Sequence, residues 1–359
     1  MIGEMPFRKY VAQMKERRTE SGRRYAMLFD VLRSFGVRRA GFIPLGDADL
    51  ISKREYGFPE DAFVISFYLP YYTNVKSNLA NFASARDYHQ YYAELFCTCE
   101  SFMNEKHPGR YFRGFADVSP FAEVLLAAKC SLGVIGDHGM LITKDASSFI
   151  VLGEAVCGLS EDELLAEGIS KGEGKVGGCT HCGECRRQCP ADAADDKSRC
   201  ISSITQKKGE LSESEKDIIR KTGMVWGCDV CALACPVTKT AMKNGTLETD
   251  IPYFTEGRLG TVDEGLISSM SDEEYDKAFL RTGKRGEKRS HSENDIGVMR
   301  PRDRCFKGQR HYIPQRTFRN RAAAGMPYSP RTAGGDMGNA PCEIRPSRKR
   351  ACARRCELH

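Results

Sequence analysis

The chain has 359 residues, 16 cysteines and a formal net charge of +6, a length that allows two or three modules with separate cores. The N-terminus shows no apolar segment of a secretory signal, and no segment reaches the roughly 20 apolar residues of a membrane span. These features argue against a secreted disulfide scaffold and a membrane protein. We therefore expect a cytoplasmic protein whose clustered cysteines bind metal.

The positive charge is confined to the C-terminal segment. Residues 283–359 hold 19 Lys and Arg against 7 Asp and Glu, whereas residues 1–282 hold 35 against 41, so the net charge does not indicate a nucleic-acid surface. The segment is rich in Arg, Pro, Gly and Ser without apolar periodicity, which predicts disorder. A shifted reading frame would produce the same break in composition. Its four cysteines lack ligand spacing and are left unassigned: Cys305, Cys342, Cys352 and Cys356.

The N-terminal half begins with a helix followed by apolar strands. The spacing of apolar residues predicts a helix over residues 8–36 that ends at Gly36. Strands are predicted over residues 38–45 and 62–70, which are apolar and rich in aromatic and β-branched side chains. A polar helical segment at residues 80–105 follows.

The same alternation continues toward the cysteines. After FRGFADVSP at residues 112–120, the pattern predicts a helix over residues 121–130 and then three strands, over residues 132–136, 140–143 and 147–156. Helices that alternate with strands are typical of an α/β domain. No G-x-G-x-x-G follows a strand, so a Rossmann dinucleotide site is not predicted.

The whole chain is predicted to be of the α+β class and to have four parts. Residues 1–165 form the α/β domain, and a turn-rich linker leads into a ferredoxin-like double-cluster domain at residues 166–245. Residues 246–282 form a short helical extension. Residues 283–359 form the disordered tail.

The cysteines that carry the chemistry begin in GGCTHCGECRRQCPADAA, residues 177–194. The spacing C-x2-C-x2-C-x3-C-P is that of bacterial ferredoxins, in which three thiolates bind one [4Fe–4S] cluster and the fourth binds its neighbour. Zinc is the alternative, but four cysteines crowded into so short a run suit a single tetrahedral ion poorly. The run consists of Cys179, Cys182, Cys185 and Cys189, and we expect His181 and Glu184 within it to face solvent.

A second run, GCDVCALACP at residues 227–236, has three cysteines instead of four. By the same crossing rule, Cys235 completes the first cluster with Cys179, Cys182 and Cys185. The second cluster then holds Cys189, Cys228 and Cys231 and lacks one ligand. Cys200, in KSRCISSIT between the runs, is the candidate for this place, with a buried helix cysteine as the alternative.

These segments carry a resemblance to a known family. SRCISSITQKKG followed by GCDVCALACP, behind the first run, resembles the epoxyqueuosine reductase family. The N-terminal half is similar in ARDYH (85–89), ADVSP (116–120) and LGVIG…MLIT…SSFIVLGEA (132–155). The resemblance covers roughly residues 25–279. It implies a cobalamin-dependent oxidoreductase with two [4Fe–4S] clusters that performs the last step of queuosine synthesis in tRNA.

The resemblance also implies roles for particular parts of the chain. Residues 1–165 would be the cobalamin-binding-like domain, with cofactor-binding side chains that remain unidentified, and Cys200 would bind the second cluster. The family's proton donor falls on Asp117; the alternative role for Asp117 is a helix N-cap. The partners implied are tRNA as substrate and an external low-potential electron donor, with no membrane, for a monomeric protein.

Two other functions stay open. One is a related cobalamin and iron–sulfur reductase with a different substrate, and the other is a ferredoxin-type electron carrier without cobalamin. The chain departs from the family at Gly136-Asp137-His138, where a Gly-Lys-Asn is common. His138 is either a cobalt ligand or a solvated loop residue.

Overall fold

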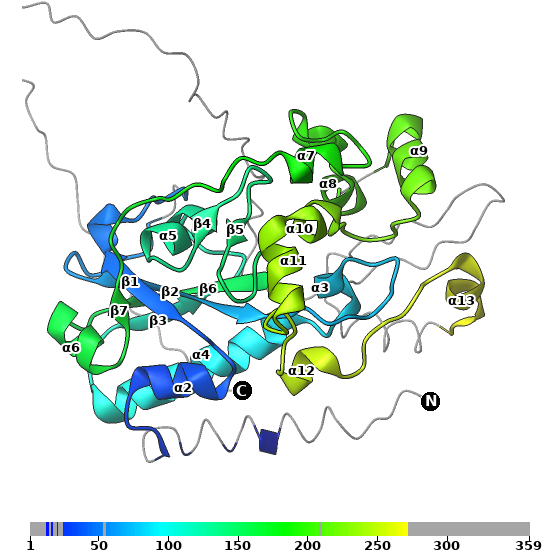
Figure 1. Ribbon diagram of the computed structural model, residues 1–359. Coiled ribbons are helices and arrows are strands. Elements are labelled where there is room, and N and C mark those ends of the chain that lie inside the picture. Colours follow the sequence, from blue (N-terminus) through cyan, green and yellow to red (C-terminus); the bar gives the residue numbers. More distant parts are fainter. Residues whose placement is uncertain are drawn as a thin grey trace, which may run out of the picture. The chain divides into compact units, whose positions relative to one another are not determined.

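The computed structural model describes residues 24–271, except 53–54 and 208–209, together with residues 12, 13, 16 and 20. Part of the predicted helix over 8–36 and the whole tail 283–359 therefore lie outside the described residues. The described part of 8–36 is not one continuous helix, because residues 25–27 are not helical and a separate helix spans Leu28–Ser34. Figure 1 shows the described part as a central sheet with helices on both faces and a group of short helices beyond it. No helix in this part is long and apolar enough to cross a membrane.

The central sheet has five strands in the order β3-β6-β2-β1-β7. The strands are β1 (Ala40–Pro44), β2 (Phe63–Pro70), β3 (Phe112–Phe115), β6 (Ile150–Cys157) and β7 (Ser170–Lys171). β1 and β7 are parallel, and the other neighbours are antiparallel. β4 (Val134–Ile135) and β5 (Leu141–Ile142) form a separate hairpin. The sheet is thus mixed, and the predicted α+β class is confirmed.

Helices cover both faces of the sheet, which explains why β2 is apolar on both sides. On one face α2 (Leu28–Ser34) and α4 (Tyr88–Lys106) bury Leu95 and Phe102 against Phe67. On the other face α5 (Glu123–Lys129) packs on the side chains of β2 that point the opposite way. The β3–α5 connection, which contains Asp117, thus leads from one edge of the sheet to the helix on this second face.

The cysteine-bearing part is built from short helices: α7 (Glu184–Arg187), α8 (Ile201–Thr205), α9 (Glu213–Thr222), α10 (Val230–Ala234) and α11 (Pro236–Lys243). In Figure 1, α7, α8 and α10 lie close together beyond the end of the sheet. Two further helices follow, α12 (Pro252–Thr255) and α13 (Glu264–Ser269). In the N-terminal half, the very short helix α3 (Asn81–Ser84) precedes α4.

The segment around α3 joins the cysteine-bearing part to the sheet. The backbones at Leu79 and Trp226 form a parallel bridge, and the N–H of Asn81 donates to the Asp229 carboxylate at 2.5 Å. Arg258 closes the junction because its Nη1 donates to the carbonyl of Asn81 at 2.7 Å and its Nη2 to the carbonyl of Tyr71. The loop between two cysteines of the second run is therefore held by backbone from the N-terminal half.

The predicted strands and the helix over 121–130 are confirmed with small shifts of their ends. The linker is where the prediction was wrong, since it contains α6 (Glu161–Ala166) and β7. A signal for α6 was present, because Ser160 and Glu163 form a capping box. β7 is only two residues long and both residues are exposed, so no apolar pattern marks it.

Candidate functional site

The first cysteine run surrounds the one-turn helix α7. Cys185 lies in this helix, and Arg187 Nη2 donates to the carbonyl of Cys182 at 2.8 Å, which folds the preceding loop back on the helix. All four cysteines of the run are at least partly accessible and none forms a disulfide: Cys179, Cys182, Cys185 and Cys189. Accessible free thiols at this spacing are what assembly of an iron–sulfur cluster requires.

Three of these cysteines interact electrostatically. Partial burial raises the pKa of Cys185, and the negative charges of Asp137, Cys179 and Cys182 raise it further. Like charges raise a pKa only when they lie close together. Cys179, Cys182 and Cys185 therefore form one group, as the motif predicts.

Cys200 lies with the other group. It is the N-cap of α8 and is half-buried, which differs from a fully buried helix cysteine. Its side chain packs with those of Cys189 and Cys228 against one small apolar cluster, made of Ala191, Ala193 and Ile201. Residues from both runs and from the segment between them thus meet at one place.

The second run extends this group. Burial raises the pKa of Cys228 to about 11, and the charges of Asp229, Cys200 and Cys189 contribute. Burial likewise raises the pKa of Cys231 to about 12, with contributions from Cys228 and Cys200. Four thiols from distant positions in the sequence therefore share one environment, and this is the set expected for the second cluster.

Cys235 is buried at the junction of α10 and α11. Its backbone N–H donates to the carbonyl of Ala232 at 3.2 Å. Helix α10, which ends just before Cys235, packs against α7 of the first run. This packing brings Cys235 to the side of α7.

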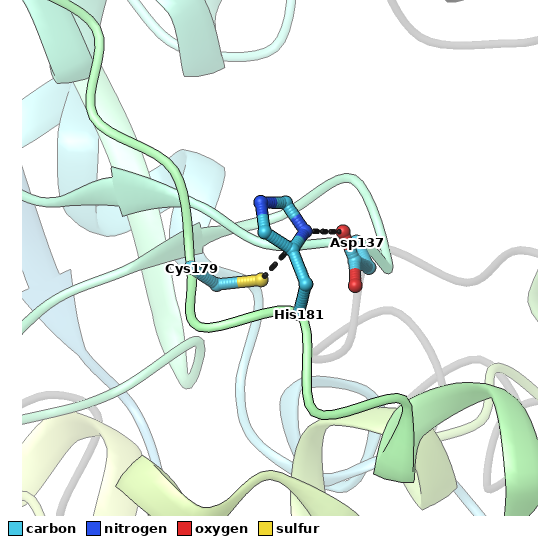
Figure 2. A group of neighbouring side chains, drawn as sticks. All are labelled: Asp137, Cys179 and His181. Carbon is cyan, nitrogen blue, oxygen red and sulfur yellow. Dashed lines mark hydrogen bonds and ion pairs between the residues drawn. The ribbon is translucent and has the colours of Figure 1, made fainter. Parts of the chain in front are cut away.

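Asp137 and His181 lie next to Cys179, a member of the first group, as Figure 2 shows. His181 Nδ1 is 2.7 Å from Asp137 Oδ1 and 3.9 Å from Cys179 Sγ. His181 is 70% exposed, as expected for a spacer, but its ring is held by a residue of the β4–β5 turn. Asp137, one of the residues at which the chain departs from the family, thus contacts His181 within the cysteine motif.

Asp117 lies in the loop between β3 and α5 with a positive φ of 60°, a conformation that non-glycine residues seldom adopt. α5 begins at Glu123, and its N-cap is Ala122. The alternative role of Asp117 as the helix N-cap is therefore wrong. Its side chain is instead half-exposed, at 46%.

Two residues of α4 hold the Asp117 carboxylate. The Tyr88 hydroxyl donates to Oδ2, and His89 Nε2 lies 2.9 Å from the same oxygen. The other ring nitrogen of His89 is 2.7 Å from Asp87 Oδ1. The imidazole is thus placed between two carboxylates, so its doubly protonated form is favoured.

This arrangement shifts the pKa of His89 upward and that of Asp117 downward. Desolvation opposes charge on His89, but Asp117 and Asp87 outweigh it and raise its pKa to about 10. Desolvation would also raise the pKa of Asp117, whereas the hydrogen bond and charge of His89 and the hydrogen bond of Tyr88 lower it overall. At neutral pH, Asp117 is ionised and His89 carries the proton.

Two more carboxyl groups lie beneath Asp117. Burial and the charge of Asp117 raise the pKa of Glu123, in the first turn of α5, to about 7. Glu154 of β6 is fully buried, and burial and the charge of Glu123 raise its pKa well above the ordinary value. Both oxygens of Glu154 lack a hydrogen-bond partner among the described residues.

His138 lies in the turn between β4 and β5. Its Nδ1 accepts a hydrogen bond from the N–H of Met140 at 3.1 Å, and its Nε2 is 3.5 Å from the Ser148 hydroxyl. Burial and the charge of Lys197 lower the pKa of His138 to about 4. The ring is therefore neutral and half-buried, which differs from a freely solvated loop histidine.

Sequence reasoning found the cysteines and Asp117 but not the side chains around Asp117. Tyr88 and His89 belong to ARDYH, whose similarity to the family was noted without a role for either residue. Glu123 and Glu154 lie in apolar segments. A lone acidic residue in each was the available signal, because glutamate is seldom fully buried without a function or a partner.

Comparison with known proteins supports the resemblance. No protein-family model matches the chain. The epoxyqueuosine reductase of Francisella cf. novicida is 31% identical over 174 residues, which are 46% of each chain. That of Escherichia coli is 30% identical over 166 residues, 44% of this chain and 41% of the relative. The chain thus matches between 37% and 50% of the length of its curated relatives.

Solved structures agree at the level of the fold. A crystal structure of epoxyqueuosine reductase with an epoxyqueuosine-modified tRNA-Tyr stem loop has a TM-score of 0.55 and 20% identity and covers 76% of each chain. A Bacillus subtilis epoxyqueuosine reductase, solved with its catalytic aspartate loop swung out of the active site, has a TM-score of 0.54 and 19% identity over the same shares. The predicted resemblance is confirmed: the chain is similar to epoxyqueuosine reductases in sequence over up to half of their length and in fold over about three quarters.

Proposed function

We propose that this protein is an oxidoreductase that reduces the epoxide of epoxyqueuosine in tRNA to the alkene of queuosine, with two [4Fe–4S] clusters and cobalamin. One observation carries the proposal: Cys200 lies beside Cys189 and Cys228 in a single apolar cluster. It supplies the eighth ligand at a spacing that ordinary ferredoxins do not use, and this spacing is the most specific part of the resemblance to the family.

The residues fit two clusters. The first would be held by Cys179, Cys182, Cys185 and Cys235, and the second by Cys189, Cys200, Cys228 and Cys231. When bound, the clusters would supply single electrons at low potential. The protein contributes a half-buried apolar shell around Cys189, Cys200 and Cys228, and such a shell controls solvent access to a cluster and its potential.

The chemistry of the donor set near Asp117 also fits cobalamin. When bound, this cofactor would supply a low-valent cobalt that can reduce a carbon–oxygen bond. Its use requires a proton source that is reachable from outside and held by the protein. Asp117 with Tyr88 and His89 is such a source, since its carboxylate is half-exposed and held by two donors.

Asp117 would act as the proton donor to the oxygen that leaves carbon. In the structure its carboxylate is ionised, because His89 and Tyr88 stabilise the charge. To serve as an acid, it must take a proton while these two bonds loosen. His89 remains protonated in the resting site and would hold Asp117 in place between turnovers.

The remaining features of the proposal concern partners. The substrate would be a modified tRNA, because an epoxyqueuosine reductase of similar fold was solved with an epoxyqueuosine-modified tRNA stem loop. An external low-potential carrier would reduce the clusters. We propose a cytoplasmic monomer, because the redox chemistry of exposed thiols requires a reducing compartment.

Anaerobic purification followed by iron, sulfide and corrinoid analysis is the first test. About eight irons per chain with one corrinoid supports the proposal. Eight irons without corrinoid binding would favour a ferredoxin-type carrier. About four irons would contradict the double-cluster assignment.

The substrate is tested separately by mass spectrometry of tRNA nucleosides from a deletion strain. Epoxyqueuosine should accumulate and queuosine should disappear, and the wild-type gene should restore queuosine. Unchanged queuosine, with cofactors present in the purified protein, would leave a related reductase with another substrate as the function.

A further inference from the structure

Glu123 and Glu154 converge beneath Asp117 from different elements. Glu154 projects from β6, where it pairs with Ser66 of β2 on one side and with Phe115 of β3 on the other. Glu123 lies in the first turn of α5, which packs on this face of the sheet. The charge of Asp117 acts on Glu123 and that of Glu123 acts on Glu154, so the three carboxyl groups lie near one another.

The two carboxyl groups lack the partners that would hold a structural charge. Glu154 has no exposed surface, and both of its oxygens are without a hydrogen bond among the described residues. Oε1 of Glu123 is also buried and unpaired. The Ser119 hydroxyl partly stabilises charge on Glu154 without forming a hydrogen bond of ordinary geometry. An isolated buried carboxylate is very unfavourable, so at least one of the groups is neutral.

The charged and titratable groups around the pair lie on every neighbouring element. The loop provides Asp117, and α4 provides His89, Tyr88 and Tyr92. Cys130, at the end of α5, is a neutral thiol whose pKa burial and the charge of Glu154 raise to about 12. The cation that acts on the pair is His89, and it already lies between Asp117 and Asp87. Among the described residues, neither glutamate forms an ion pair that would keep it ionised.

We propose that Glu123 is the proton store of this site, which passes its proton to Asp117, and that Glu154 stays neutral beside it. This inference rests on the proposed function and adds to it a residue that supplies protons without touching the substrate. Glu123 is suited to this role by position, since the loop of Asp117 leads into α5, whose first residue is Glu123. Its affinity for protons also matches neutral pH.

Conversion of an epoxide into an alkene and water takes up two electrons, which the clusters would supply, and two protons, of which Glu123 would supply one and solvent the other. The carboxyl proton of Glu123 moves to the Asp117 carboxylate, and Asp117 then transfers a proton to the leaving oxygen. The first transfer is uphill, and the second is strongly downhill because an alkoxide is far more basic than a carboxylate. Glu123 is left as a carboxylate and regains a proton from solvent through the half-exposed Asp117. Glu154 keeps its proton throughout, so two charges are never buried together.

The direct test is infrared spectroscopy of the anaerobically purified holoprotein from about pH 5 to about pH 9. The wild type should show the C=O band of a protonated carboxyl group that fades as pH rises through about 7, with a second component that persists. Glu123→Gln should remove the fading component. Glu154→Gln should remove the persistent one and leave the midpoint of the fading one unchanged, because glutamine is as neutral as a protonated glutamate.

Activity provides the second test. In Glu123→Gln the kcat at pH 7 should fall on the order of 10²-fold with KM unchanged. The decline of kcat as pH rises through 7 should disappear, an effect that a merely structural role would not produce. Glu173→Gln is the matched control, since the side chain of this glutamate is 71% exposed and its one ion pair, with Lys175 at 3.8 Å, is long. The infrared spectrum and the kcat of this variant should equal those of the wild type.

Different results would overturn different statements. A wild-type spectrum without a component that depends on Glu123 would overturn the proton store. A normal kcat and pH profile in a folded Glu123→Gln variant would overturn its part in turnover. If the wild type does not reduce epoxyqueuosine at all, the proposed function fails, while the infrared titration still decides whether Glu123 holds the proton.

Discussion

His89 Nε2 lies 2.9 Å from Asp117 Oδ2, and the same imidazole lies 2.7 Å from Asp87 through its other nitrogen. One histidine thus fixes the charge of the proposed acid and is itself fixed by the N-cap of α4. Because the proton of the pair is on His89 and not on Asp117, the proposed role of Asp117 as an acid requires that it first take up a proton.

The titration of His89 should be strongly shifted. Its pKa is raised to about 10, so the stabilisation it provides is complete below its ordinary value of 6.5 and is lost as pH rises toward 10. The pKa of Asp117 is lowered, so its contribution is present above its ordinary value of 3.8 and is lost as pH falls below that. NMR of the His89 ring should show a midpoint near 10. Asp117→Asn should move this midpoint toward 6.5, whereas a wild-type midpoint near 6.5 would contradict the ion pair.

Asp117→Asn should abolish turnover without disturbing the cofactors. Asparagine keeps the size of the side chain but cannot donate a carboxyl proton, so kcat should fall by about 10²- to 10⁴-fold. Iron and corrinoid contents should equal those of the wild type. Asp49→Asn is a suitable control, because Asp49 forms an exposed pair with Lys129. Full activity of the Asp117 variant would remove this residue from the mechanism.

The Cys200→Ser variant should lose the second cluster. The thiol lies with Cys189 and Cys228, and a serine hydroxyl is a poor ligand for iron–sulfur clusters. Iron should fall from about eight to about four atoms per chain. Electron paramagnetic resonance of the reduced protein should lose the signal of two interacting clusters. Cys97→Ser, a half-buried cysteine of α4, should change neither measurement. Equal iron content in the Cys200 variant would contradict the ligand assignment.

Arg258→Lys should weaken the junction between the sheet and the cysteine-bearing part. The guanidinium Nη1 donates to the Asn81 backbone and side chain at 2.7 and 2.9 Å and to the Ser84 hydroxyl at 2.8 Å. Burial lowers the pKa of Arg258 to about 10. A lysine cannot reproduce the planar fork, so we expect a loss of about 2–4 kcal/mol.

Such a loss should lower the thermal midpoint by on the order of 5–15 °C, measured anaerobically with the clusters loaded. Arg220→Lys is the control, because Arg220 forms an ion pair with Asp217 on the surface of α9. A midpoint of the Arg258 variant equal to that of this control would show that the buried network contributes little.

The sequence predicted well what depends on local patterns. The strand at residues 62–70 was predicted because its apolar run is short and β-branched, and β2 begins one residue later and ends at the same residue. The cysteines were identified as candidate ligands because their spacing is itself the motif, and their binding of clusters stays a prediction. α6 was missed although Ser160 and Glu163 carry the capping signal, because the glycines that follow in the linker favoured a turn.

The surroundings of Asp117 could not be predicted in the same way. Tyr88 is 29 residues away from Asp117 along the chain, and Glu154 reaches the site from the middle of a sheet whose strand order is not sequential. Only the fold brings these groups together. Their pKa values, which decide which group holds the proton, depend on burial and on the distances between the groups as well as on residue type.

The bond between the Asn81 backbone and Asp229 has a consequence for modularity. Asp229 lies between Cys228 and Cys231, and the neighbouring backbone groups of Asn78 and Ala80 bond with Val225 and Trp226. The scaffold of the second set of thiols is therefore completed by a segment nearly 150 residues earlier in the chain. Recombination or gene fusion that transplants the cysteine-rich stretch must carry this earlier segment with it, so the two are inherited as one unit rather than as exchangeable parts.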